Sequence, residues 1–110
     1  MTMQIVEYLD DKGHSPFGSW FTNINAHAAA KATTALVRLE GGDTSNVKRI
    51  GGGIHEIKID FGPGYRVYFG LDGSEIVILL AGGSKKRQDK DIETAQKRWA
   101  GYKAWKKKET

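Results

Sequence analysis

The chain has 110 residues, no cysteine and a formal net charge of +4. This length fits a single domain, expected over residues 1–110, with one sheet and a few helices. The lack of cysteine excludes a disulfide framework and any thiolate nucleophile or thiolate metal site. Because no apolar run reaches about 18 residues and no signal-like segment opens the chain, we expect a cytoplasmic protein outside the membrane.

The N-terminal half is predicted to hold one strand and two helices. The stretch "MQIVEYL" has the β-branched and aromatic content of a short strand. Ser15 followed by Pro16 is typical of a helix N-cap with proline in the first turn, which predicts a helix through Ile24. An alanine-rich helix is expected from near Asn25 to the glycine pair at 41–42. The polar, glycine-rich "DTSNVKRIGGG" then reads as a connector.

From Ile54 the apolar period changes to two, which predicts strands. In "IHEIKIDF" and "YRVYFGL" apolar side chains alternate with polar ones, and "EIVILLA" is apolar on both faces, as in an interior strand. Asp72-Gly73 is typical of a two-residue hairpin turn. The apolar stripe of a final helix follows at Ile92, Ala95, Trp99 and Tyr102. We therefore predict an α+β fold with an N-terminal strand, two helices, a three-stranded antiparallel meander that completes one sheet, and a C-terminal helix.

Positive charge is concentrated toward the C-terminus. Between positions 85 and 108 stand ten basic residues, namely Lys85, Lys86, Arg87, Lys90, Lys97, Arg98, Lys103, Lys106, Lys107 and Lys108. Such an excess is typical of a protein with a polyanionic partner. The segment Lys103–Thr110 is predicted to be a basic tail, and its last lysines have simple solvation as the alternative interpretation.

A three-residue turn at Gly62-Pro63-Gly64 would fix the register of the first hairpin. It pairs Ile59 with Val67 and Phe61 with Tyr65, so that core residues face core residues. Every second residue then points away from that core.

Arg66 is the centre of the polar cluster that this register predicts. Asp60 would lie opposite Arg66, and Lys58 opposite Tyr68, on the face away from the core. The Asp72-Gly73 hairpin would set Leu79 opposite Arg66, so the chain leaves the sheet beside the arginine. The polar face and its rim would then gather Glu56, Lys58, Arg66, Tyr68, Lys85 and Lys86. Nearer the opposite rim we expect Lys48 and Arg49.

This cluster has the groups that metal-free RNA cleavage requires. The reaction needs a base for the 2′-hydroxyl, a cation on the phosphate and a donor to the leaving 5′-oxygen. Glu56 is the candidate base, Arg66 the cation, and Lys58 or Lys86 the donor. The alternative is structural, with Glu56 and Asp60 merely pairing with the basic residues across the strands. No metal-ligand spacing or phosphate-binding glycine loop is present, so no metal and no cofactor are expected.

Three stretches together carry a family resemblance: "SPFGSWF", "LEGGDTSNVKRIGGGIHEIKIDFGPGYRVYFG" and "IVILLAGGSKKRQDKDIETA". From Ile5 to about Tyr102 the chain resembles the RelE/ParE toxin superfamily, most closely its HigB-like, phage-related "addiction module killer protein" branch. By position, Arg66 matches the arginine of the family's "YR" strand, and Lys58 and Lys86 match basic residues in and after the neighbouring strands. Glu56 stands where RelE-like members have lysine.

The resemblance implies the toxin of a type II toxin–antitoxin system, a ribosome-dependent mRNA endoribonuclease that inhibits translation. Its expected partners are a cognate helix-turn-helix antitoxin, the ribosome and mRNA. Contacts to RNA or to the ribosome are expected from Lys48, Arg49, Tyr68, Lys85 and Arg87, with the tyrosine able to stack on an unpaired base. Two alternatives stay open: a ParE-like inhibitor of a topoisomerase without nuclease activity, and a degenerate module that only binds an antitoxin.

Overall fold

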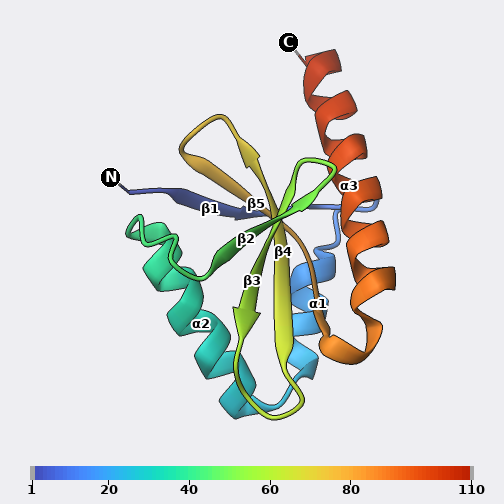
Figure 1. Cartoon of the computed structure of the whole chain (residues 1–110). Coiled ribbons are helices and arrows are strands. Elements are labelled where there is room, and N and C mark those ends of the chain that lie inside the picture. Colours follow the sequence, from blue (N-terminus) through green and yellow to red (C-terminus); the bar gives the residue numbers. More distant parts are fainter. Residues whose placement is uncertain (1, 110) are drawn as a thin grey trace.

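The computed structural model describes residues 2–109 and contains one sheet with helices on both faces (Figure 1). In chain order the elements are β1 (Gln4–Glu7), α1 (Pro16–Asn23), α2 (Ala26–Glu40), β2 (Val47–Gly51), β3 (Ile54–Ile59), β4 (Tyr65–Asp72), β5 (Ile76–Ser84), the 3-10 turn η1 (Lys85–Arg87) and α3 (Gln88–Glu109). This order confirms the α+β class and every predicted helix.

The sheet has five strands in the order β1-β5-β4-β3-β2. Strand β1 runs parallel to β5, and the other neighbours are antiparallel. Strand β2 lies in the segment expected to be a connector, so the predicted meander was one strand short. Its glycine run is the turn of the β2–β3 hairpin, where Gly52 and Gly53 have φ values of 65° and 82°. Glycine adopts this left-handed region without strain, which permits the tight turn.

Side-chain caps begin the first two helices where the sequence indicates. The Ser15 hydroxyl accepts a hydrogen bond from the Gly18 amide at 2.9 Å, and Pro16 occupies the first turn. The Asn25 side-chain oxygen accepts one from the His27 amide at 2.8 Å. Each cap satisfies an amide that the helix itself leaves free.

Alternate residues of the strands enter two separate cores, one on each face of the sheet. On β5, Val77 and Leu79 belong to the core that includes residues of α1 and α2, whereas Ile78 and Leu80 belong to the core that includes α3. Both faces are therefore covered by helices. The face expected to be open to solvent, which carries Tyr68, is partly closed by α3.

Helix α3 is continuous from Gln88 to Glu109, so the segment predicted as a tail is helical up to its last described residue; Thr110 lies outside the described part. The predicted stripe is confirmed, because Ala95 and Trp99 are buried against the sheet. The Trp99 ring lies directly over Gly70, where an added Cβ would come within 2.5 Å of it. The bare backbone of this glycine makes room for the helix.

The strand registers differ from those expected. Lys58 pairs with Arg66 and Ile57 with Val67, a shift of two residues. Since side chains alternate with a period of two, this slip leaves every residue of the hairpin on its predicted face. In the second hairpin Arg66 pairs with Gly83 rather than Leu79, because the turn is longer than two residues and the register shifts at Tyr68/Phe69. The end of β5 still emerges at the end of the sheet where Arg66 lies.

Candidate functional site

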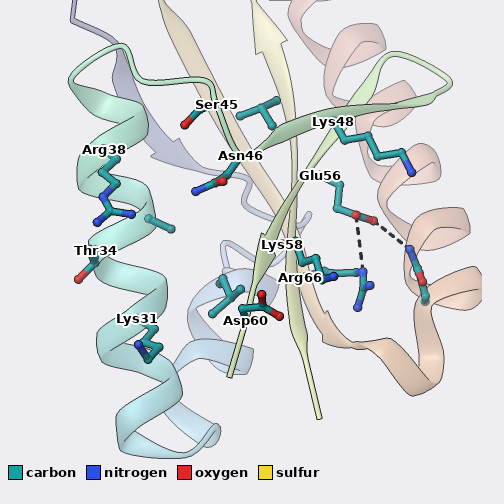
Figure 2. A pocket seen from close by; sticks show the side chains of 14 residues that line it. Lys31, Thr34, Arg38, Ser45, Asn46, Lys48, Glu56, Lys58, Asp60 and Arg66 are labelled. Carbon is teal, nitrogen blue, oxygen red and sulfur yellow. Dashed lines mark hydrogen bonds and ion pairs between the residues drawn. The ribbon is translucent and has the colours of Figure 1, made fainter. Parts of the chain in front are cut away.

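A cavity of about 850 Å³ opens beside β2 and β3 and is bounded on its other side by α2 (Figure 2). Strand β2 supplies Lys48, β3 supplies Glu56 and Lys58, and β4 supplies Arg66. Asp60, just after β3, also lines it. Among the predicted catalytic residues, Glu56, Lys58 and Arg66 thus meet in one place.

Glu56 and Arg66 form a buried ion pair inside this cavity. Arg66 Nε lies 3.5 Å from Glu56 Oε1, and the two residues are only 6% and 5% exposed. The other carboxylate oxygen, Oε2, accepts a hydrogen bond from Gln88 Nε2 at 3.0 Å. Figure 2 shows both contacts as dashed lines. Glu56 therefore does pair with a basic residue across the strands, which was the structural alternative in the sequence analysis. The pair is diagonal, because the residue directly opposite Glu56 is Tyr68 and not Arg66.

The arginine keeps unused donors despite this pair. Its Nε and Nη1 groups are buried and have no hydrogen-bond partner among residues 2–109. Buried donors without a partner are costly, and they usually indicate a ligand or solvent that completes the site. An oxyanion of an incoming ligand is the chemical group that such donors bind best.

Two lysines extend the positive charge on the same face of the sheet. Lys58 is the direct cross-strand neighbour of Arg66, and Lys48 is that of Glu56. Lys48 therefore lies inside the cavity and not near the opposite rim, where the sequence placed it. Arg49 is the next residue of β2 and stands opposite His55. Because adjacent strand residues point to opposite faces, Arg49 is turned away from the cavity.

His55 has a structural role, because strand alternation puts it on the same face of β3 as the buried Ile57. Its ring stacks on Phe69 with centroids 5.2 Å apart and an interplanar angle of 18°. Burial, helped by the charge of Arg49, lowers the pKa of His55. The lowered pKa favours the uncharged form of the ring, as its packing against Phe69 requires.

The basic residues that follow β5 are not brought into this cavity. Lys85, Lys86 and Arg87 are exposed in η1 and line a separate hollow of about 430 Å³ at the start of α3. The Lys85 amide donates to the Gly64 carbonyl at 3.1 Å, which keeps η1 at the same end of the sheet as Arg66. The structure therefore offers no direct contact between Lys86 and the Glu56–Arg66 pair.

The expectation that Tyr68 stacks on a base is wrong in this fold. Tyr68 is fully buried in the core beneath α3, so neither face of its ring is accessible. Burial, with the nearby charges of Glu56 and Asp91, raises the pKa of its hydroxyl. Gln88 is a residue that the sequence analysis missed. It stands 32 positions from Glu56, and no local pattern indicates their contact.

Residues 2–109 contain no group of three or more His, Asp or Glu side chains placed to hold a metal ion. In the same range, no helix combines the length and the apolar character needed to cross a bilayer.

Residues 19–100 match the model of the family described as "Phage derived protein Gp49-like (DUF891)". The chain belongs to this family. The Gp49-like family is part of the RelE/ParE-like toxin superfamily, as the sequence resemblance predicted. An uncharacterized protein of Haemophilus influenzae (strain Rd) is 41% identical over 97 residues, which cover 87% of this chain and 92% of that protein.

A solved structure shares the fold of this Gp49-like protein. It is a mutant of the E. coli toxin RelE in the free state, with a TM-score of 0.59. The alignment covers 84% of this chain and 97% of RelE, at 14% sequence identity. The RelE-like fold expected from the sequence is confirmed.

Proposed function

We propose that this Gp49-like protein is the toxin of a type II toxin–antitoxin pair and cleaves mRNA on the ribosome, in the cytoplasm. Membership of the RelE/ParE-like superfamily supports the toxin assignment. The RelE-like toxin fold implies an antitoxin partner, for which we propose a cognate helix-turn-helix protein. The observation that carries the nuclease assignment is the cavity in which the buried carboxylate of Glu56 lies among Lys48, Lys58 and Arg66.

The proposed reaction uses these groups without a metal ion. Glu56 removes the proton of the 2′-hydroxyl, whose oxygen attacks the adjacent phosphorus. Arg66 and Lys48 bind the phosphate oxygens as the pentacoordinate state forms. The bond from phosphorus to the 5′-oxygen then breaks, and Lys58 gives that oxygen a proton. The products are a 2′,3′-cyclic phosphate and a free 5′-hydroxyl.

The ion pair implies an order of events. In the free protein Arg66 neutralises Glu56, and Gln88 holds the carboxylate from the other side. A phosphate that binds Arg66 Nη1, which has no hydrogen-bond partner among residues 2–109, competes with Glu56 for the guanidinium. Substrate binding would thus release the carboxylate to act as a base. Lys58, adjacent to Arg66 across the strands, replaces Lys86 as the proposed proton donor because Lys86 lies outside the cavity.

The test is a reconstituted translation reaction with a defined mRNA, in which cleavage sites are mapped by primer extension. We expect the wild type to cut the message and the Lys58→Gln variant to cut it at least about a hundredfold more slowly, the lower end of the range for a lost general acid. The matched control is Lys97→Gln, which removes an exposed lysine on α3 that forms an ion pair with Glu93.

Absence of cleavage by the wild type would overturn the nuclease assignment. Inhibition of DNA gyrase in a supercoiling assay would then point to the ParE-like alternative. If the protein inhibits neither translation nor DNA supercoiling, the remaining alternative is a module that only binds an antitoxin. Equal cleavage by the wild type and the Lys58→Gln variant would remove Lys58 from the reaction while leaving the nuclease activity in place.

A further inference from the structure

We propose that the α2 wall of the cavity is a second RNA-binding surface, on which Lys31 and Arg38 hold the backbone of a single strand that leads to Arg66. The proposal rests on the proposed function, since it extends the same cavity and the same substrate class. It assigns a role to residues that the sequence analysis did not single out.

Helix α2 contributes basic side chains to the cavity. Lys31, Thr34 and Arg38 are spaced three and four residues apart, which puts them on one face of the helix. All three line the cavity that also contains Lys58 and Arg66 (Figure 2). The cavity therefore passes around the exposed edge of β3, with Lys31 and Arg38 of α2 on one side of that edge and Lys58 and Arg66 on the other.

The cavity opens along the edge of β3, beside α2, because β2 ends before β3 does. Its pairing with β3 stops at Val47 opposite Ile57, so Lys58 and Ile59 pair only with β4. An edge strand presents peptide N–H and C=O groups to whatever lies beside it. Here the cavity lies beside it, so ribose hydroxyls and base edges can reach these groups.

The charges of the cavity favour a polyanion. Five cationic side chains line it against two carboxylates: Lys31, Arg38, Lys48, Lys58 and Arg66 against Glu56 and Asp60. Of these five cations, Arg66 is the one that forms an ion pair with an acid within residues 2–109. A concave surface lined by one sign of charge concentrates ligands of the opposite sign.

The neutral lining favours RNA over an acidic protein segment. An extended peptide added to a sheet edge uses apolar pockets for alternate side chains. The neutral lining of this cavity is mixed: Ala35, Val47 and Ile59 are apolar, and the polar groups Thr34, Ser45 and Asn46 lie between its cations. The amide of Asn46 makes no side-chain hydrogen bond within the described residues, so it is available to a base edge. Unpaired bases of a single strand expose such edges, whereas those of an RNA duplex are hidden in a narrow groove.

The experiment measures binding of a fluorescent single-stranded RNA by anisotropy over a series of salt concentrations. The test variant is Lys31→Gln/Arg38→Gln. The control is Lys12→Gln/Lys97→Gln, which removes the same charge from exposed positions outside the cavity. Because single-strand binding falls with a log–log slope of about −0.7 per phosphate contact, loss of two contacts should make the slope shallower by about 1.4.

We expect the shallower slope in the test variant and a wild-type slope in the control. Equal slopes in wild type and test variant, an equal change in the control, or no salt-dependent binding by the wild type would overturn the proposal. So would displacement of the RNA by polyglutamate at the same charge concentration, which would point to an acidic protein partner.

This outcome is separable from that of the translation assay. A wild type that binds RNA through α2 but leaves the message intact would support this surface and reject the nuclease. If the wild type cleaves the message but the test variant keeps the wild-type salt slope, the nuclease is supported and the α2 surface is rejected.

Discussion

Arg66 Nε lies 3.5 Å from Glu56 Oε1, and this contact joins neighbouring strands at the back of the candidate site, where both side chains are almost inaccessible to water. The proposed base and the proposed phosphate ligand are therefore also a structural ion pair. Removing either residue changes stability as well as chemistry. The two effects can be separated, because the surroundings of the two charges are unequal.

Glu56→Gln should destabilise the protein more than Arg66→Gln. The first change leaves Arg66 together with Lys48 and Lys58 and without a carboxylate partner, whereas the second leaves Glu56 beside those two lysines. Breaking a buried pair costs about 3–5 kcal/mol, and we expect Glu56→Gln to fall in that range. The measurement is the free energy of unfolding in urea.

The double variant Glu56→Gln/Arg66→Gln completes the cycle. We expect it to be more stable than Glu56→Gln alone, because no unpaired charge is then buried. Single costs that simply add in the double variant would mean that the contact contributes no coupling.

Gly70→Ala should weaken the docking of α3. The added Cβ would come within 2.5 Å of the Trp99 ring, and overpacking of this kind costs about 1–3 kcal/mol. Gly101→Ala is the matched control, since no atom lies within 4 Å of its added Cβ. Within an exposed part of a helix, that change should instead add up to about 1 kcal/mol. Urea titrations followed by tryptophan fluorescence measure both, and an equal response of the two variants would contradict the close packing.

The fold could be predicted from the sequence to the level of faces but not of registers. The alternation of apolar and polar residues shows which side chains share a face of the sheet. A shift of two positions in the strand pairing leaves these faces unchanged, as with Lys58, which pairs with Arg66 in place of Asp60. The length of the chain reversal decides the register, and no pattern within the strands encodes it. Strand β2 was not predicted because "VKRIG" is short and is followed by glycines. This glycine-rich segment is typical of a linker, although here it forms a hairpin turn.

The candidate site could be predicted only where its residues share one hairpin. Glu56, Lys58 and Arg66 were placed together because strand alternation puts them on one face. Tyr68 was misjudged because the stripe on α3 predicts that the helix packs, but not over which face of the sheet. Lys31 and Arg38 were missed because only the tertiary position of α2 brings them to the cavity.

His55 should make stability depend on pH in the range where histidine titrates. Burial, followed by the charge of Arg49, lowers the pKa of His55 below its usual value of 6.5. A group whose pKa is lower in the folded state stabilises fully above the unfolded-state value and loses that contribution as pH falls through the folded-state value. We therefore expect the urea midpoint to fall as the pH is lowered from about 7 to 5.

The His55→Phe variant keeps an aromatic ring against Phe69 and removes the titrating group. Its urea midpoint should change less over the same pH range than that of the wild type. The control His14→Phe replaces an exposed histidine and should keep the wild-type dependence. A steeper dependence in His55→Phe than in the wild type would contradict the assignment.

Asp72 should hold the C-terminal half of α3 to the end of β4. Its Oδ2 accepts hydrogen bonds from Lys106 Nζ and, at 2.7 Å, from the Tyr102 hydroxyl. The bond from Lys106, then that from Tyr102, lowers the pKa of Asp72 below 3.8. The tether is therefore complete above about pH 4 and is lost as the pH falls through the lowered folded-state value.

Asp72→Asn should loosen this end of the helix at neutral pH. We expect hydrogen exchange of the amides in the last two turns of α3 to quicken about two- to fivefold, the range for a partly exposed ion pair. The control Asp89→Asn removes one carboxylate from the opposite end of the same helix and should leave those amides unchanged. Unaltered exchange in Asp72→Asn would show that the packing of Trp99 against the sheet holds the helix without the carboxylate.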